Sequence, residues 1–147
     1  MSKNSSVILL VEDDSAHAEL VKRGFKDHRI ENTIFHVSDG EEALDYLFRR
    51  GTYEDPEKSP RPRVILLDLR MPKIDGLEVL KEVKGAHELS GLPVVILSTS
   101  AAEHDLARTS EYHANSYLVK PSDYDKFIQM IDMIGTYWLN MNILTDI

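Results

Sequence analysis

Three short runs of the chain consist entirely of valine, isoleucine and leucine, and they limit the folds open to it. The runs are residues 7–11, 64–67 and 94–97. A strand with one face in water alternates apolar and polar residues, whereas an unbroken apolar run is typical of a strand buried on both faces. Such strands occur in parallel sheets that helices cover on both sides. The runs therefore predict the centre of a parallel sheet.

Weaker strand patterns and helical patterns fill the rest of the chain. Two further strands are predicted at residues 33–37 and 116–119, and the helical patterns cover 15–25, 39–49, 75–84, 102–112 and 122–140. Ser15 and Ser122 stand where the first and last helices should begin, and we predict them as N-caps. Five strands alternating with five helices predict an α/β fold with helices on both faces of a parallel sheet.

Composition excludes several classes of protein. The chain has 147 residues, a length that favours one domain, and 42% of them are hydrophobic, enough for a core. It has no cysteine, which excludes disulfides, thiolate nucleophiles, cysteine zinc sites and iron–sulfur clusters. The formal charge of −8 argues against a nucleic-acid partner. No apolar run reaches the roughly 20 residues of a membrane span, so we expect a cytoplasmic protein without a membrane partner.

The domain boundaries follow from local composition. Residues 1–6 are polar and are predicted to be disordered, residues 7–140 to form the domain, and residues 141–147 a C-terminal extension. Within the domain, residues 51–63 contain three of the six prolines and predict a long loop. This loop is either a surface elaboration or a binding segment.

Polar residues follow four of the predicted strands directly. They are Glu12, Asp13 and Asp14 after the first strand, Asp68 after the third, Ser98 after the fourth and Lys120 after the fifth. Because the carboxyl ends of parallel strands meet at one edge of the sheet, these side chains should lie together. Clustered carboxylates repel one another unless a cation joins them, and oxygen ligands suit Mg²⁺. The cluster predicts a magnesium site.

The same cluster suggests phosphoryl chemistry. Asp68 would act as a nucleophile toward phosphorus. Lys120, together with the cation, would neutralise the oxygens of the phosphoryl group, and Ser98 would donate a hydrogen bond to one of them.

Simpler interpretations stand beside these. Residues 12–14 alone would be a solvated turn with a helix cap, and Asp75 is interpreted as the N-cap of the third helix. The six histidines show no metal-binding spacing and are interpreted as surface or half-buried residues. The serines at 98 and 100 have no histidine and acid in an evident triad.

The spacing of these residues resembles a known family. Residues 68–76 read DLRMPKIDG, which is similar to the phosphoacceptor loop D-x-x-x-P-x-x-D-G, and Ser98 follows Asp68 after 30 positions. Lys120 precedes a proline 52 positions after Asp68, and Tyr117 lies three residues before it. With the acidic pair at residues 12–13, the chain resembles the receiver domains of two-component response regulators over about residues 7–134.

The resemblance implies a fold, a reaction and a cofactor. The fold would be flavodoxin-like, a doubly wound (βα)5 sheet with strand order 2-1-3-4-5. Asp68 would accept a phosphoryl group from a phosphohistidine of a sensor histidine kinase. Mg²⁺ would be bound by Asp13 directly, by Glu12 through water, by Asp68, and by the main-chain carbonyl of Arg70. Lys120 and Ser98 would take part in the reaction.

The resemblance also implies how such a protein signals. Ser98 and Tyr117 would be switch residues that rearrange the face made by the fourth helix, fifth strand and fifth helix. Many family members hold the Lys-Pro bond cis, which implies a cis bond between Lys120 and Pro121. The chain would not be an enzyme in the usual sense, since it would catalyse only its own phosphorylation and dephosphorylation.

A narrower resemblance concerns the subfamily. The loop 51–63, residues 61–69 and the tail with Trp138 are similar to the stand-alone regulators paired with cyanobacterial phytochromes, which implies a phytochrome-like kinase. Arg70 and Thr99 depart from the commoner residues at their positions, and we expect them to slow dephosphorylation. The last helix carries two apolar stripes, which predicts a homodimer or a kinase-docking surface on it.

Other functions remain as alternatives. The chain would be a phosphotransfer shuttle within a relay, or a degenerate receiver that acts only as a binding module. A hydrolase of the haloacid dehalogenase type is disfavoured, because it needs a second acid where Arg70 stands. A flavodoxin-like FMN protein is disfavoured, because the acids at residues 12–14 would repel the phosphate of the flavin.

Overall fold

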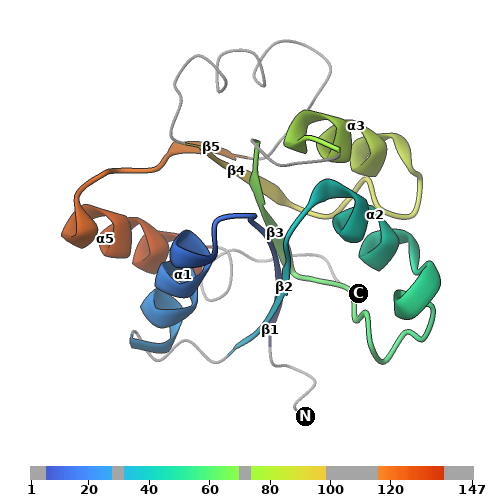
Figure 1. Cartoon of the computed structure of the whole chain (residues 1–147), viewed down its shortest axis with the longest axis horizontal. Helices are drawn as coiled ribbons and strands as arrows, with labels where there is room; N and C mark the ends of the chain where they lie inside the picture. The colour runs from blue at the N-terminus through green and yellow to red at the C-terminus, as the bar shows by residue number, and fades with distance from the viewer. Residues whose placement is uncertain (1–5, 28–31, 70–73, 99–115, 138–147) are drawn as a thin grey trace.

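The computed structural model describes residues 6–27, 32–69, 74–98 and 116–137, and Figure 1 shows the whole chain with labels for its elements. The strands are β1 (Ser6–Val11), β2 (Asn32–Val37), β3 (Val64–Asp68), β4 (Val94–Ser98) and β5 (Ser116–Val119). The helices are α1 (Ser15–Asp27), α2 (Gly40–Phe48), a 3-10 turn η2 (Gly51–Tyr53), α3 (Gly76–Gly85) and α5 (Tyr124–Gly135). The helix predicted at 102–112 and Trp138 lie outside the described residues.

The five strands form one sheet in the order β2-β1-β3-β4-β5, and every pairing is parallel. The register places Leu9 beside Ile65, and Leu67 beside Ile96. Asp68 and Ser98 are the last residues of their strands, and Ser98 pairs with Val119. The flavodoxin-like fold and its strand order are confirmed, and the carboxyl ends of the strands share one edge.

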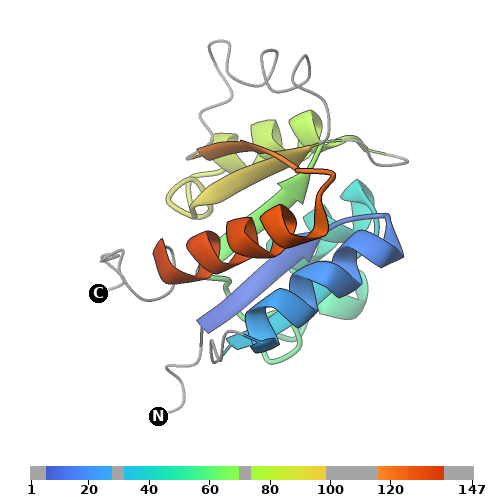
Figure 2. The ribbon, with the colours of Figure 1, turned by 90° about the vertical axis from the view of Figure 1, so that its left-hand side faces the viewer.

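Helices cover both faces of the sheet, as the apolar runs predict. Helices α1 and α5 lie against one face and α2 and α3 against the other (Figures 1 and 2). Neighbouring strand residues point to opposite faces, so Leu9 and Ile65 join the core beneath α2 and α3, while Ile8 and Leu66 join the core beneath α1 and α5. Within the described residues, no helix is long and apolar enough to cross a membrane.

Two predicted helix caps are wrong by one residue. Helix α1 is capped by Asp14, whose Oδ1 accepts hydrogen bonds from the N–H groups of Ala16 (2.9 Å) and His17 (3.2 Å). Helix α5 is capped by Asp123, whose Oδ1 accepts from Lys126 at 3.0 Å. Aspartate caps a helix as well as serine does, so the sequence left two adjacent candidates at each site.

The third predicted cap is confirmed, because Asp75 Oδ1 accepts a hydrogen bond from the Glu78 N–H at 3.0 Å. Asp75 therefore has a structural role at the start of α3.

The long loop at residues 51–63 is tied to α2. Tyr46 Oη donates a hydrogen bond to the Pro60 carbonyl at 2.7 Å, and Tyr53 Oη donates to Glu42 Oε2 at 2.7 Å. The rings of Tyr46 and Tyr53 pack with centroids 5.2 Å apart. The loop is thus a fixed part of the α2 side of the domain.

Candidate functional site

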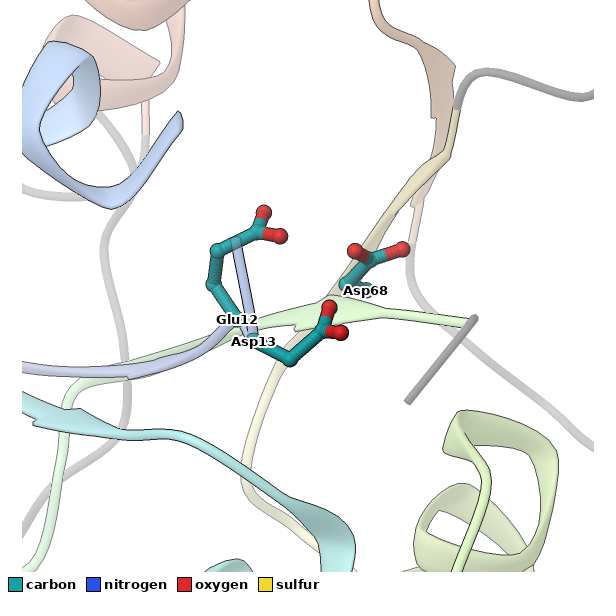
Figure 3. A group of neighbouring side chains, drawn as sticks. All are labelled: Glu12, Asp13 and Asp68. Carbon is teal, nitrogen blue, oxygen red and sulfur yellow. The ribbon is translucent and has the colours of Figure 1, made fainter. Parts of the chain in front are cut away.

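Three carboxylates meet at the carboxyl edge of the sheet. Each of Glu12, Asp13 and Asp68 offers an oxygen, and these oxygens all lie within 4.8 Å of one another. Figure 3 shows Glu12 and Asp13 following β1 and Asp68 at the end of β3, with their carboxylates turned toward one another. Glu12 and Asp68 are buried, whereas Asp13 is exposed. The predicted acidic cluster is therefore present and has one side open to solvent.

The acids after β1 are fixed by the neighbouring edge strand. The Glu12 N–H donates to the Val37 carbonyl at 3.1 Å, which continues the ladder between β1 and β2 by one residue. His36 Nε2 lies 2.7 Å from the Glu12 carbonyl oxygen. The carbonyl can only accept, so this imidazole nitrogen is the donor.

The turn after Asp68 requires a glycine. The Gly76 N–H donates to the Leu69 carbonyl at 2.9 Å, which closes the loop between β3 and α3. A Cβ atom at Gly76 would lie 2.4 Å from the Asp68 carbonyl oxygen. The D-G pair of the sequence motif is thus explained by an N-cap at Asp75 and by close backbone contact at Gly76.

Lys120 joins the acidic cluster from β5. Its Nζ lies 2.6 Å from Glu12 Oε1 and 3.5 Å from Asp68 Oδ2, and all three side chains are largely buried. Its backbone N–H donates to the Ser98 carbonyl at 2.7 Å. The sequence predicted Lys120 beside the acids, and the structure adds that Glu12 is the nearer acid.

Burial sets the protonation of the cluster. Desolvation of Glu12, followed by its hydrogen bond with Asp68, raises the pKa of Glu12 to about 7, against the opposing effect of Lys120. Two carboxylates that share a buried site hold a proton more tightly, because ionising both would place two negative charges close together. Three hard oxygen donors, one of them open to water, fit the ligands that Mg²⁺ prefers.

The remaining predicted residues fall into three groups. Ser98 is buried at the end of β4, at the same edge as the acids. Asp14 caps α1, and its carboxylate is not part of the acidic cluster. Arg70, Thr99 and the side chain of Tyr117 lie outside the described residues.

The prediction of a cis peptide bond between Lys120 and Pro121 is wrong, because none of the peptide bonds described in the structure is cis. The trans form is the ordinarily preferred isomer of a bond before proline, by about 0.5–1 kcal/mol. The ammonium of Lys120 reaches the acids with the bond in this form.

Two histidines, His17 and His36, contact the site, and sequence reasoning did not assign them to it. Both are half-buried, in agreement with the prediction, and His17 Nδ1 lies 3.1 Å from Lys120 Nζ. Their positions in the sequence could have indicated this. His17 lies in the first turn of α1, shortly after the acids at residues 12–14, and His36 is the residue before the last of β2, whose end shares the edge.

Comparison with known proteins agrees with the geometry. A family model described as the response regulator receiver domain matches residues 8–132. The probable methanogenesis regulatory protein FilR2 of Methanothrix harundinacea is 43% identical over 136 residues, which cover 92% of this chain and 85% of that protein. Response regulator Rcp1 of Synechocystis is 41% identical over 138 residues, which cover 94% of this chain and 92% of Rcp1.

Two solved structures share the fold over nearly their whole length. The Mn²⁺-bound form of Rcp1 superposes with a TM-score of 0.85, covering 95% of this chain and 98% of Rcp1. The phosphorylated cyanobacterial phytochrome response regulator RcpA, 36% identical, has a TM-score of 0.88 and covers 97% of this chain and 99% of its own. The resemblance to phytochrome-associated regulators is thereby confirmed. On its strand order, its acidic edge and these matches, the chain belongs to the response regulator receiver domain family.

Proposed function

We propose that this chain is a phosphoreceiver that takes a phosphoryl group onto Asp68 from a phosphohistidine of a sensor histidine kinase. The observation that carries the proposal is the placement of Asp68 beside two further carboxylates and the ammonium of Lys120, 3.5 Å from Asp68 Oδ2. A carboxylate oxygen of Asp68 attacks phosphorus, the bond from phosphorus to the imidazole nitrogen breaks, and the imidazole leaves with a proton.

Magnesium is the proposed cofactor of this transfer. Asp13 and Asp68 would bind the ion directly, Glu12 through water, and Arg70 through its main-chain carbonyl. When bound, Mg²⁺ supplies positive charge to the phosphoryl oxygens. The oxygen-only donor set supports this assignment, and so does the Mn²⁺-bound form of the similar protein Rcp1.

Lys120 and Ser98 would serve the same phosphoryl group. The Lys120 ammonium would neutralise charge on its oxygens, and the Ser98 hydroxyl would donate a hydrogen bond to one of them. Both residues stand at strand ends of the edge that carries Asp68. Ser98 and Tyr117 would then act as the switch that reports phosphorylation.

The output would pass through protein contacts on the α5 side. Among the described residues, four large apolar side chains on β5, on α5 and just after α5 are between 49% and 60% exposed, namely Val119, Tyr124, Met133 and Tyr137. We propose that this face forms a homodimer, and the phytochrome regulators among its relatives favour a phytochrome-like kinase as the partner. Sedimentation of the phosphorylated chain should show a dimer, and a monomer at high concentration would contradict it.

The lifetime of the phosphoryl group would be set partly by Arg70 and Thr99. Arg70→Asn and Thr99→Ala should shorten the acyl-phosphate half-life, and unchanged half-lives would contradict a role for these residues.

Phosphoramidate tests the proposal because it donates through a P–N bond, as phosphohistidine does. The intact mass should rise by one phosphoryl group with Mg²⁺ and should not rise with EDTA or in Asp68→Asn. Asp75→Asn is the matched control, since asparagine caps a helix as well as aspartate does and uptake should persist. No uptake would favour a degenerate receiver that acts as a binding module. Uptake followed by transfer to a histidine phosphotransfer protein would favour a relay shuttle.

A further inference from the structure

His17 places an imidazole nitrogen against the ammonium that the proposed reaction uses. Its Nδ1 lies 3.1 Å from Lys120 Nζ, and its ring packs beside the ring of Phe127 with centroids 6.0 Å apart. The three protons of the ammonium face three neighbours, with Glu12 Oε1 at 2.6 Å and Asp68 Oδ2 at 3.5 Å as the other two. Lys120 is therefore held from the side of α1 and β1.

The chemistry of the contact fixes the state of the imidazole. A lysine ammonium only donates hydrogen bonds, so Nδ1 must carry no proton and must accept. The same Nδ1 lies 3.7 Å from Asp14 Oδ2. The His17 backbone N–H lowers the pKa of the Asp14 carboxyl, which keeps it charged. Neutral His17 thus pairs with Lys120, whereas protonated His17 would repel Lys120 and pair with Asp14.

We propose that His17 is a positioning residue whose Nδ1 holds the Lys120 ammonium beside Glu12 in the resting state and opposes its movement to the phosphoryl group on Asp68. This inference rests on the proposed function and adds a means of regulating it. The hydrogen bond stabilises the resting state alone, because Lys120 must turn to the phosphoryl oxygens when Asp68 is modified. Losing the bond therefore lowers the barrier to phosphorylation.

The surroundings of His17 allow it to change partners. Asp14 lies beside it at the start of α1, and Lys120 lies beside it after β5 with Glu12 as its further partner. A pocket of about 530 Å³, lined by His17, Lys120 and Tyr124 among others, opens beside the ring.

Two substitutions at position 17 separate the hydrogen bond from the packing. Asparagine places its Oδ1 near the position of Nδ1 and does not titrate, whereas leucine fills the space beside Phe127 without an acceptor. At pH 8, His17→Leu should take up a phosphoryl group from phosphoramidate about two- to tenfold faster than the wild type. His17→Asn should match the wild type at pH 8.

Comparing the variants at one pH cancels the effect of other titrating groups, including Glu12. Equal rates for the wild type and His17→Leu at pH 8 would overturn the proposal, and so would a slower leucine variant.

Nitrogen NMR of the unphosphorylated chain tests the contact independently of phosphoryl transfer. His17 should show a proton on Nε2 and a bare Nδ1 at pH 8, and Lys120→Met should shift the Nδ1 resonance. A proton on Nδ1 at pH 8 would overturn the proposal. If even the wild type takes up no phosphoryl group, the proposed function fails, and the NMR result still decides whether His17 holds Lys120.

Discussion

Lys120 Nζ lies 2.6 Å from Glu12 Oε1 but 3.5 Å from Asp68 Oδ2, so the ammonium is bound more closely to the acid after β1 than to the acid of β3. Strands β4 and β3 lie between β5, which precedes Lys120, and β1, which precedes Glu12. The Lys120 side chain therefore reaches along the edge of the sheet to its partner. The ammonium therefore occupies the acidic cluster as a tethered cation, and a divalent cation that uses Glu12 must compete with it.

Removing that tethered cation should change metal binding and phosphorylation in opposite directions. In Lys120→Met, Mg²⁺ should bind more tightly, because no ammonium competes for Glu12, while phosphoryl uptake should fall by tenfold or more. Calorimetric titration with Mg²⁺ and uptake from phosphoramidate measure the two effects. Lys126→Met, on the exposed side of α5, should change neither. Weaker Mg²⁺ binding in Lys120→Met would contradict competition.

The raised pKa of Glu12 predicts a stability that depends on pH when no divalent cation is present. The folded chain holds a proton on Glu12 up to about pH 7, whereas the unfolded chain releases it near the ordinary value of 4.5. The contribution to stability is therefore full below pH 4.5 and is lost as the pH rises through about 7. Urea unfolding in EDTA should show a loss on the order of 1–3 kcal/mol over this range.

Glu12→Gln is the control for this slope, because glutamine resembles the neutral carboxyl and does not titrate. Its stability should change less between pH 5 and 8 than that of the wild type. Parallel curves for the two proteins would show that Glu12 does not titrate near pH 7.

Glycine at position 76 should be required by the backbone between β3 and α3. A Cβ atom there would lie 2.4 Å from the Asp68 carbonyl oxygen and 2.6 Å from the Leu69 Cα, so Gly76→Ala must displace the loop. We expect a loss of about 1–3 kcal/mol in thermal or urea unfolding. Gly85→Ala is the matched control at the other end of α3, where a Cβ would meet nothing within 4 Å. Equal effects at both positions would contradict this explanation.

Hydrogen bonds from the hydroxyl groups of Tyr46 in α2 and Tyr53 in η2 should stabilise the loop at residues 51–63. Tyr46→Phe removes the donor to the Pro60 carbonyl and should cost about 1–2 kcal/mol, because Tyr46 is fully buried. Tyr53→Phe should cost less, since its partner Glu42 is half-buried and can be hydrated. Chemical unfolding of both variants checks the order, and a larger loss in Tyr53→Phe would reverse it.

The sheet could be predicted from the sequence because strands buried on both faces leave an unbroken apolar run, as residues 64–67 show. The acids and Lys120 could be placed together because parallel strand ends share an edge. The closer pairing of Lys120 with Glu12 could not be predicted from the sequence, since it depends on the conformation of a flexible side chain. The hydrogen bonds from Tyr46 to the Pro60 carbonyl and from Arg61 to the Leu47 carbonyl could not be predicted either, because they end on backbone carbonyls that every residue carries.

Asp68 is the proposed phosphoacceptor, and chemical trapping of the acyl phosphate would identify the residue that carries the phosphoryl group. The chain is treated with phosphoramidate and Mg²⁺, reduced with borohydride and digested, and the peptide that contains residue 68 is sequenced by mass spectrometry. Borohydride converts an aspartyl phosphate to homoserine, so we expect homoserine at position 68 and unchanged aspartates at positions 13 and 75. Homoserine at another position, or none while the intact mass has risen by a phosphoryl group, would contradict it.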